Sequence, residues 1–407
     1  MKTLSGSKKK IDSKTNIQTS GAKLAIEGGV PLRKSWLQYS RQTIDDSDIA
    51  SVTHVLKSDF LTRGPATEAF EIAVANLAEM PYAVAFSSAT AALHAVMAMI
   101  GVRPGVKVVT SPITFAATGN SVLYCQGEVE FQDIESETMN LDPRTLKNLD
   151  QVKAVVPVDF AGNPCDYDLF KTLQKKHSFR LISDAAHSLG ATYKGKPAGS
   201  FSDITVYSFH PVKSITTGEG GMVVLRDREE ADFLRVFRSH GICKTNTPGF
   251  YRQEFLGFNY NITDIQCALG LSQLKRLKTF VAQRTEIAEQ YNEFFSSFES
   301  VSIPVETKNC RSAWHLYPLR LNLEKLNCDR DRFLTALQAE NIGANVHYIP
   351  VYWHPYYMNL GFTRGLCPRA EVEYEREISL PIFPGMKAQD IRDVCQGVKK
   401  VLEAYSL

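Results

Sequence analysis

The feature that most constrains this chain is an alternation of short apolar runs with helical patterns, from about Thr43 to Leu274. Runs such as KVVTSP, VKAVVPVDF, RLISDAAHS and ITVYSF are short and rich in β-branched residues, and segments with helical periodicity separate several of them. Strands that alternate with helices indicate a mostly parallel sheet covered by helices on both faces. In such sheets the working side chains gather at the carboxyl ends of the strands.

The pattern changes after about Gln273. The segment LKRLKTFVAQRTEIAEQYNEFFSSF predicts a long amphipathic helix, and a mixture of strand and helix patterns follows it to the C-terminus. We therefore predict an α/β fold with a large domain over residues 23–277, which includes an N-terminal segment, and a smaller α+β domain over residues 278–407. Residues 1–22 are rich in Ser, Thr and Lys and are predicted to be a disordered tail.

Composition excludes several classes of protein. The 407 residues carry a formal net charge of +2, which favours neither nucleic acid nor a membrane surface as the main partner. No apolar run approaches the length of a membrane-spanning helix, and the basic N-terminus lacks the apolar core of a secretory signal. The eight cysteines form no CxxC pair or zinc spacing. The sequence thus predicts a cytoplasmic protein with reduced thiols and no metal site.

Two strand ends carry polar groups that a cofactor could use. In SSATAALH, small and hydroxyl residues follow an apolar run and precede a helix, so the segment offers a helix N-terminus to a phosphate or is an ordinary N-cap. In RLISDAAHS, Asp184 closes a strand and His187 follows it. A buried carboxylate needs a partner. A protonated cofactor nitrogen, an Arg side chain or a helix N-terminus would each serve.

The segment SFHPVKSITTGEGG places Lys213 among small and hydroxyl residues after another strand. A lysine in a low-dielectric site forms a Schiff base with a carbonyl, although most lysines are simply solvated. The order of the three strand ends meets the demands of pyridoxal 5'-phosphate: a helix N-terminus for the phosphate, an acid for the ring nitrogen and a lysine for the aldehyde. The chain has no P-loop and no dinucleotide-binding glycine motif.

These motifs resemble the DegT family of nucleotide-sugar aminotransferases, which belongs to the fold-type I group of PLP-dependent transferases. The similarity runs from about Leu37 to the C-terminus through LTRGP, SSATAALH, DAAHSLGATYKG, SFHPVKSITTGEGG, GFNYNITDIQCALGLSQL and VHYIPVYWHPYY. It implies that Lys213 forms the Schiff base and moves the proton. It implies that Asp184 pairs with the ring nitrogen, and that the other cofactor contacts are Ala89, Thr90, Phe115, His187 and Ser208.

The resemblance also implies a homodimer with shared active sites. Asn259, in GFNYN, matches an asparagine that reaches the phosphate of the neighbouring subunit's cofactor. Relatives commonly have Arg two residues later, where this chain has Asn261, and the role of that Arg is therefore open here. Contacts to the substrate are expected from Thr62, His210, His315, His347 and Tyr348. For His210, a contact to the cofactor phosphate and a purely structural role also stay open. Arg320, Tyr352, Trp353 and His354 are further candidates for the nucleotide, unless the aromatic side chains belong to the core.

The later motifs resemble the C4-aminotransferases of pseudaminic acid synthesis. The implied substrates are UDP-2-acetamido-2,6-dideoxy-β-L-arabino-hex-4-ulose and L-glutamate, which leaves as 2-oxoglutarate. Lys213 favours amination over the dehydration carried out by relatives that have His at this position. Three alternatives remain open: amination of another dTDP- or GDP-linked 4-ketosugar, a non-catalytic regulatory homologue, and a lysine-dependent lyase without a cofactor.

Overall fold

A seven-stranded sheet forms the centre of the larger part of the chain. The computed structural model describes residues 23–245 and 247–407, so the predicted tail lies outside the described residues. The strands follow the order β1-β9-β8-β5-β4-β2-β3, and only β9 is antiparallel to its neighbours. The mostly parallel sheet is therefore confirmed. Its strands are β1 (Tyr82–Phe86), β2 (Lys107–Thr110), β3 (Glu128–Phe131), β4 (Val152–Val156), β5 (Arg180–Asp184), β8 (Ile204–Ser208) and β9 (Gly221–Leu225).

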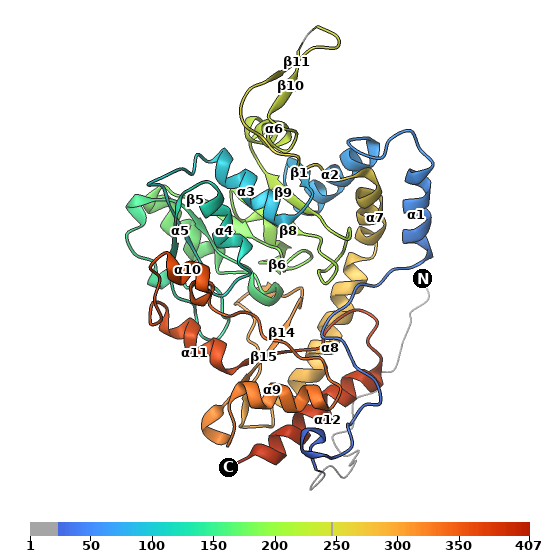
Figure 1. Cartoon of the computed structure of the whole chain (residues 1–407), viewed down its shortest axis with the longest axis vertical. Helices are drawn as coiled ribbons and strands as arrows, with labels where there is room; N and C mark the ends of the chain where they lie inside the picture. The colour runs from blue at the N-terminus through green and yellow to red at the C-terminus, as the bar shows by residue number, and fades with distance from the viewer. Residues whose placement is uncertain (1–22, 246) are drawn as a thin grey trace.

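Helices cover both faces of this sheet (Figure 1). Because side chains alternate along a strand, Val84 and Phe86 of β1 pack on one face, whereas Ala83 and Ala85 pack on the other. The first face is covered by α3 (Ala89–Met99), α4 (Ala117–Tyr124) and α6 (Arg228–Phe237). The second face is covered by α2 (Pro65–Leu77), α5 (Tyr167–His177) and α7 (Asp264–Leu274), and α1 (Asp46–Leu56) packs on α7.

The C-terminal part is a small antiparallel sheet with three helices. The sheet has the order β12 (Val301–Ser302), β14 (Tyr317–Leu321) and β15 (Glu377–Leu380). Around it lie α8 (Leu277–Phe295), α9 (Arg330–Ala339) and α12 (Ala388–Tyr405). The long helix predicted from Leu274 begins at Leu277, because the chain turns at Arg276. The Arg276 guanidinium pairs with Asp45, the N-cap of α1, and with Asp48 in the first turn of α1.

The remaining elements are short and lie outside the two main sheets. The hairpin of β10 (Ile242–Lys244) and β11 (Tyr251–Gln253) projects from the large domain in Figure 1. A small sheet joins β6 (Thr192–Tyr193), β7 (Lys196–Pro197) and β13 (Cys310–Arg311), and α10 (Pro355–Asn359) and α11 (Pro368–Arg376) precede β15.

The domain limits stay a prediction. Leu24 and Leu37 pack in the core of the C-terminal sheet, whereas Tyr352 packs in the core of the central sheet.

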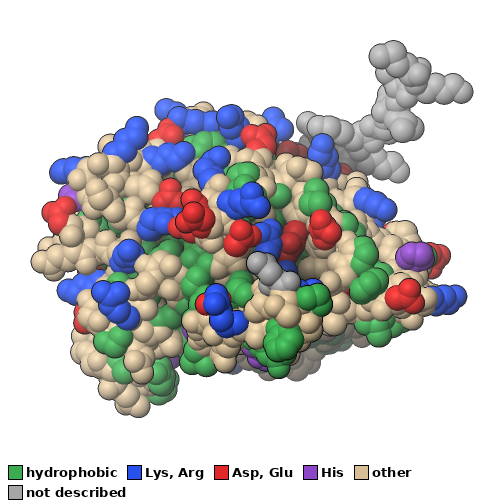
Figure 2. Space-filling view, turned by 90° about the horizontal axis from the view of Figure 1, so that it is seen from above, with side chains coloured by type: hydrophobic (Ala, Val, Ile, Leu, Met, Phe, Trp, Pro, Cys, Tyr) green, Lys and Arg blue, Asp and Glu red, His purple; other side chains and the backbone are tan. Residues whose placement is uncertain are grey.

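The surface carries mixed charge. On the face seen in Figure 2, Lys and Arg side chains are interspersed with Asp and Glu side chains.

Across residues 23–245 and 247–407, no helix has both the length and the apolar character that a bilayer crossing requires, and no group of three His, Cys, Asp or Glu side chains is placed to hold a metal ion.

Candidate active site

Lys213 lies in the loop that connects β8 to β9, at the edge of the sheet where β5 and β8 end. It is partly buried, and its Nζ lies 3.4 Å from Nε2 of His315. Burial lowers the pKa of Lys213 to about 8; the nearby Arg284 acts in the same direction and Asp184 opposes it. A lysine with this pKa supplies a neutral amine near physiological pH, as an attack on a carbonyl requires.

Asp184 ends β5 and is 5% exposed. Its Oδ2 accepts a hydrogen bond from Thr118 Oγ1 at 2.7 Å and its Oδ1 accepts one from the Ala186 N–H at 3.1 Å. Burial raises the pKa of Asp184, while these two bonds and the charge of Lys213 oppose the rise. Within the described residues no Arg or Lys nitrogen lies within 4.0 Å of this carboxylate. The carboxylate therefore keeps acceptor capacity for a cationic partner such as a protonated ring nitrogen.

The start of α3, with the backbone N–H groups of Ala89 and Thr90, forms a cup at the same edge of the sheet. Ser88 is the N-cap and accepts a hydrogen bond from the Ala91 N–H, whereas in the described part of the chain the N–H groups of Ala89 and Thr90 have no partner. A Cβ added to Gly221 would meet the Ala89 nitrogen at 2.5 Å. Glycine therefore lets β9 approach the helix start, and Gly221 also pairs with Ser208 at the end of β8. Free N–H groups and a hydroxyl beside a helix N-terminus suit a phosphate.

Two aromatic rings and two histidines complete the site. Phe115 is 64% exposed, and its ring centroid lies 6.3 Å from that of Tyr348. The Tyr348 hydroxyl is 3.2 Å from His187 Nε2, and the rings of His187 and His315 are 4.2 Å apart. Burial lowers the pKa of both histidines, so both are neutral at physiological pH. Their Nδ1 atoms are buried and have no hydrogen-bond partner in the described residues.

Pyridoxal phosphate fits this arrangement. The α3 cup and Ser208 would hold its phosphate, Asp184 its ring nitrogen and Lys213 its aldehyde carbon. The Nδ1 atoms of His187 and His315, beside the amine of Lys213, are buried without a hydrogen-bond partner in the described residues, and a buried polar atom of this kind is rare without a ligand or water. The acid, the amine and the cup follow the ends of three strands of one sheet, and their roles toward the cofactor stay a prediction.

The other predicted residues lie around this centre in different settings. His315 is only 2% exposed and packs against Lys213. His347 is also buried, and its Nδ1 lies 2.9 Å from the Ser379 hydroxyl. Burial lowers its pKa to about 3. His210 is exposed, and its carbonyl accepts a hydrogen bond from the Lys213 N–H at 2.9 Å. Thr62 is exposed in a loop that pairs with Thr263 before α7.

Asn259 lies on the exposed surface after the hairpin β10–β11. Its Oδ1 accepts a hydrogen bond from the Nδ2 of Asn261 at 3.1 Å, and the Asn261 Oδ1 accepts one from the Ser239 hydroxyl at 2.9 Å. Asn261, which replaces the usual Arg, thus holds the carboxamide of Asn259 and leaves its Nδ2 free to donate outward.

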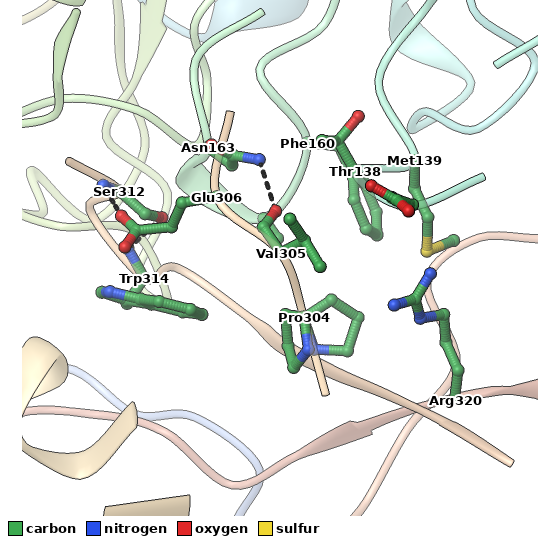
Figure 3. A pocket seen from close by; sticks show the side chains of 13 residues that line it. Thr138, Met139, Phe160, Asn163, Pro304, Val305, Glu306, Ser312, Trp314 and Arg320 are labelled. Atoms are coloured by element: carbon green, nitrogen blue, oxygen red, sulfur yellow. Dashed lines mark hydrogen bonds between the residues drawn. The ribbon is translucent and has the colours of Figure 1, made fainter. Parts of the chain in front are cut away.

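Arg320, one of the candidates for the nucleotide, lines a small cavity (Figure 3). Arg320 is 5% exposed and donates hydrogen bonds to the carbonyls of Ser136 and Ile303, so it holds two loops together. Tyr352 and Trp353 both donate to the Glu371 carboxylate and belong to the core, as the alternative interpretation of these aromatic residues expected.

Sequence reasoning missed two supports of the site. Thr118 donates to Asp184 from α4, one helical turn after Phe115, and its hydroxyl was visible in the motif TFAAT. Asp159 is fully buried and accepts hydrogen bonds from the hydroxyls of Tyr167 and Ser188, so it fixes the residue after His187. No local sequence pattern marks Thr118 or Asp159 as a support, because each role depends on a side chain that is brought close only by the fold.

Comparisons with known proteins assign the family. Residues 42–399 match the DegT/DnrJ/EryC1/StrS aminotransferase family, and the chain belongs to it. The chain is 38% identical to the spore coat polysaccharide biosynthesis protein SpsC of Bacillus subtilis, over 92% of this chain and 99% of that protein. It is 37% identical to a UDP-4-amino-4,6-dideoxy-N-acetyl-beta-L-altrosamine transaminase of Campylobacter jejuni, over 90% of this chain and 98% of that one.

Solved structures agree in fold. The aminotransferase PseC of Helicobacter pylori, described as involved in pseudoaminic acid biosynthesis, superposes with a TM-score of 0.86 at 32% identity, over 91% of this chain and all of that one. The PLP form of the sugar aminotransferase Spr1654 from Streptococcus pneumoniae has a TM-score of 0.85 at 29% identity, over 91% of this chain and 99% of that one. The chain is therefore a PLP-dependent sugar aminotransferase with the fold predicted from its motifs.

Proposed function

We propose that this enzyme transfers the amino group of L-glutamate to C4 of UDP-2-acetamido-2,6-dideoxy-β-L-arabino-hex-4-ulose, with Lys213 as the catalytic lysine. The observation that carries the proposal is the convergence of Lys213, Asp184 and the α3 cup at one sheet edge. The choice of sugar rests on similarity to the altrosamine transaminase and to PseC.

Each residue has a distinct task in this proposal. Bound pyridoxal phosphate would supply an electron sink for the carbon that carries the transferred amino group. Lys213, as a neutral amine, removes the proton from Cα of glutamate and later delivers a proton to C4 of the sugar, which fixes the configuration there. Asp184, which keeps spare acceptor capacity, favours a protonated ring nitrogen, and Thr118 and the Ala186 N–H hold its carboxylate in place.

Space for the nucleotide is available beside Phe115. A hollow of about 480 Å³ between α4 and α10 is lined by Ala116, Asn120, Leu123, Tyr124, His354, Tyr356 and Tyr357. Its aromatic side chains offer stacking faces to a base. This placement supports a nucleotide-linked substrate, while the sugar itself is chosen by the similarity described above.

Measured turnover of different nucleotide-linked 4-ketosugars tests the proposed substrate. The UDP-linked 4-ketosugar is incubated with the enzyme and glutamate, and NMR reads the C4 configuration of the product. We expect the amino sugar named above, and dTDP- and GDP-linked 4-ketosugars serve as competitors. Faster turnover of one of these would instead favour the second candidate, amination of another nucleotide sugar. The comparable identity to SpsC, which is named for spore coat polysaccharide, supports that candidate.

The lysine is tested separately. Reduction of the purified enzyme with borohydride should attach the cofactor to the peptide that contains Lys213, as read by mass spectrometry. The Lys213→Ala variant should lose transamination, because it lacks the amine that this proposal uses. Labelling of another lysine, or transamination by Lys213→Ala, would contradict the assignment.

We also propose a homodimer in which Asn259 serves the partner's site. Exposed apolar side chains near the hairpin β10–β11 support a partner contact: Phe250, Tyr251, Leu256 and Phe258. Light scattering should give twice the chain mass. Mixing the Lys213→Ala and Asn259→Ala variants after subunit exchange should restore part of the activity, because hybrid dimers contain one site with both native residues. Mixtures no more active than their separate components would refute shared sites.

A further inference from the structure

Arg284 is a buried cation that no carboxylate neutralises. It lies on α8 and is 1% exposed, and among the described residues no Asp or Glu oxygen comes within 4.0 Å of its guanidinium. Burying a charge without a paired counterion is costly, and buried arginines are usually paired for this reason. The partners of the guanidinium must therefore be groups other than carboxylates.

The guanidinium binds backbone carbonyls from three separate segments. Nη1 donates to the carbonyls of Trp314, His315 and Ile382 at 3.2, 3.2 and 2.7 Å, and Nη2 donates to the carbonyl of Val212 at 3.4 Å. Val212 directly precedes Lys213, and Ile382 follows β15 in the small domain. Tyr291, two turns farther along α8, donates to the adjacent Pro381 carbonyl at 2.8 Å and supports the same segment.

The contacts of Arg284 link the segment that carries Lys213 to the segment that carries His315. The imidazole of His315 meets the amine of Lys213 at 3.4 Å, and the guanidinium donates to the carbonyls of His315 and of Val212, the residue before Lys213. Because a planar fork with several donors fixes its acceptors in direction as well as distance, a lysine in its place could not reproduce the arrangement. We propose that Arg284 is a positioning residue for the amine of Lys213: it holds the lysine loop and the His315 segment in register, and it places an unneutralised positive charge behind the lysine.

The positive charge of Arg284 disfavours protonation of the Lys213 amine. The titratable groups that influence Lys213 are Asp184 at the end of β5 and Arg284 on α8, and the histidines near it are His187, His210, His315 and His347. His187, His315 and His347 are neutral at physiological pH because burial lowers their pKa values, and burial also lowers the pKa of His210. Asp184 stabilises the ammonium form and Arg284 opposes it, so loss of the Arg284 charge should raise the pKa of Lys213 above about 8.

The experiment separates charge from geometry and rests on Lys213 being the catalytic lysine. Trace acetylation of the apoenzyme at a series of pH values, followed by mass spectrometry of the Lys213 peptide, gives the midpoint at which the amine becomes reactive. We compare Arg284→Met, which removes the charge and the donors, with Arg284→Lys, which keeps an amine donor but loses the fork. Arg320→Met is the control for loss of a buried guanidinium elsewhere, because Arg320 also donates to two carbonyls, but it has Glu373 at 3.9 Å as an acidic partner and is not among the groups that shift the pKa of Lys213.

We expect the midpoint of Arg284→Met to rise by about one pH unit. Arg284→Lys should lower kcat about 10- to 100-fold, since a misplaced catalytic group costs about that much. Arg320→Met should leave the midpoint unchanged. If Arg284→Met fails to fold, a fully active Arg284→Lys enzyme would still overturn the positioning role. An unchanged midpoint in a folded Arg284→Met protein would overturn the charge effect. Borohydride labelling of a lysine other than Lys213 would instead contradict the catalytic assignment.

Discussion

Replacing Gly221 with Ala tests the phosphate cup most directly. The added Cβ would lie 2.5 Å from the Ala89 nitrogen and 2.6 Å from its Cα, whereas an ordinary contact begins at 3.4 Å. Both neighbouring atoms are backbone, so no side-chain rotation relieves the clash, and β9 and the start of α3 must separate by about 0.9 Å. A shift of this size moves an N–H group of α3 from hydrogen-bond distance to beyond it.

The magnitude follows from the bonds lost. A hydrogen bond to a charged group contributes about 1.5–3 kcal/mol. Loss of one such bond should weaken cofactor binding about 10- to 150-fold, at about 1.4 kcal/mol per factor of ten. Overpacking should also lower the free energy of unfolding of the apoenzyme by about 1–3 kcal/mol. Absorbance titration with pyridoxal phosphate gives the Kd, and urea unfolding gives the stability.

Gly397→Ala is the matched control. Its Cβ would meet the tip of the Ile342 side chain in the small-domain core, which lies away from the cup and can rotate. This variant should keep the Kd of the native enzyme within about twofold, whatever its stability. A Gly221→Ala enzyme with native cofactor affinity and native stability would show that α3 and β9 do not form the cup described here.

Two further predictions concern the supports of the site. Thr118→Val removes the hydrogen bond to Asp184 at 2.7 Å, so cofactor affinity should fall by about tenfold or more; an unchanged Kd would show that Asp184 needs no such support. The pKa of His347 is lowered to about 3 and those of His187 and His315 are also lowered, so the unfolded chain takes up protons below its ordinary histidine pKa while the folded chain does not. The free energy of unfolding should therefore fall as the pH drops below about 6.5, by up to about 1.4 kcal/mol per pH unit for each histidine. Urea unfolding of the native protein and His347→Gln at pH 7 and pH 5 checks this, and the variant should lose less stability between them; equal losses would contradict a neutral His347.

The sequence predicted the parts of the fold that repeat locally. Short β-branched runs located the strands of the central sheet, and the polar residues after them located Asp184, Lys213 and the start of α3. Helix ends were less exact: α8 begins at Leu277 instead of Leu274, because Arg276 turns toward Asp45 and Asp48, which are distant in sequence. A partner this distant leaves no local pattern.

Roles that depend on tertiary contact were beyond the sequence. His315 could be named as a site residue, but its place against Lys213 depends on how the small domain packs. Thr118 and Arg284 have no unusual neighbours in the sequence, and only the meeting of α4 with β5, and of α8 with two loops, gives them a role. Conversely, Tyr352 and Trp353 look like ligand-binding aromatics in the motif VHYIPVYWHPYY, yet their polar atoms bond to Glu371 inside the core.

The single antiparallel strand of the central sheet has a consequence for the order of folding. Because β9 runs back beside β8, the lysine segment between Ser208 and Gly221 closes by a local hairpin, whereas β1 joins β9 only after a far longer stretch of chain has been brought together. Local closure loses less chain entropy than distant closure. We therefore expect Lys213 to reach its place early in folding, and the cup that Gly221 and α3 form to be completed later, so that cofactor affinity reports on the last step of assembly.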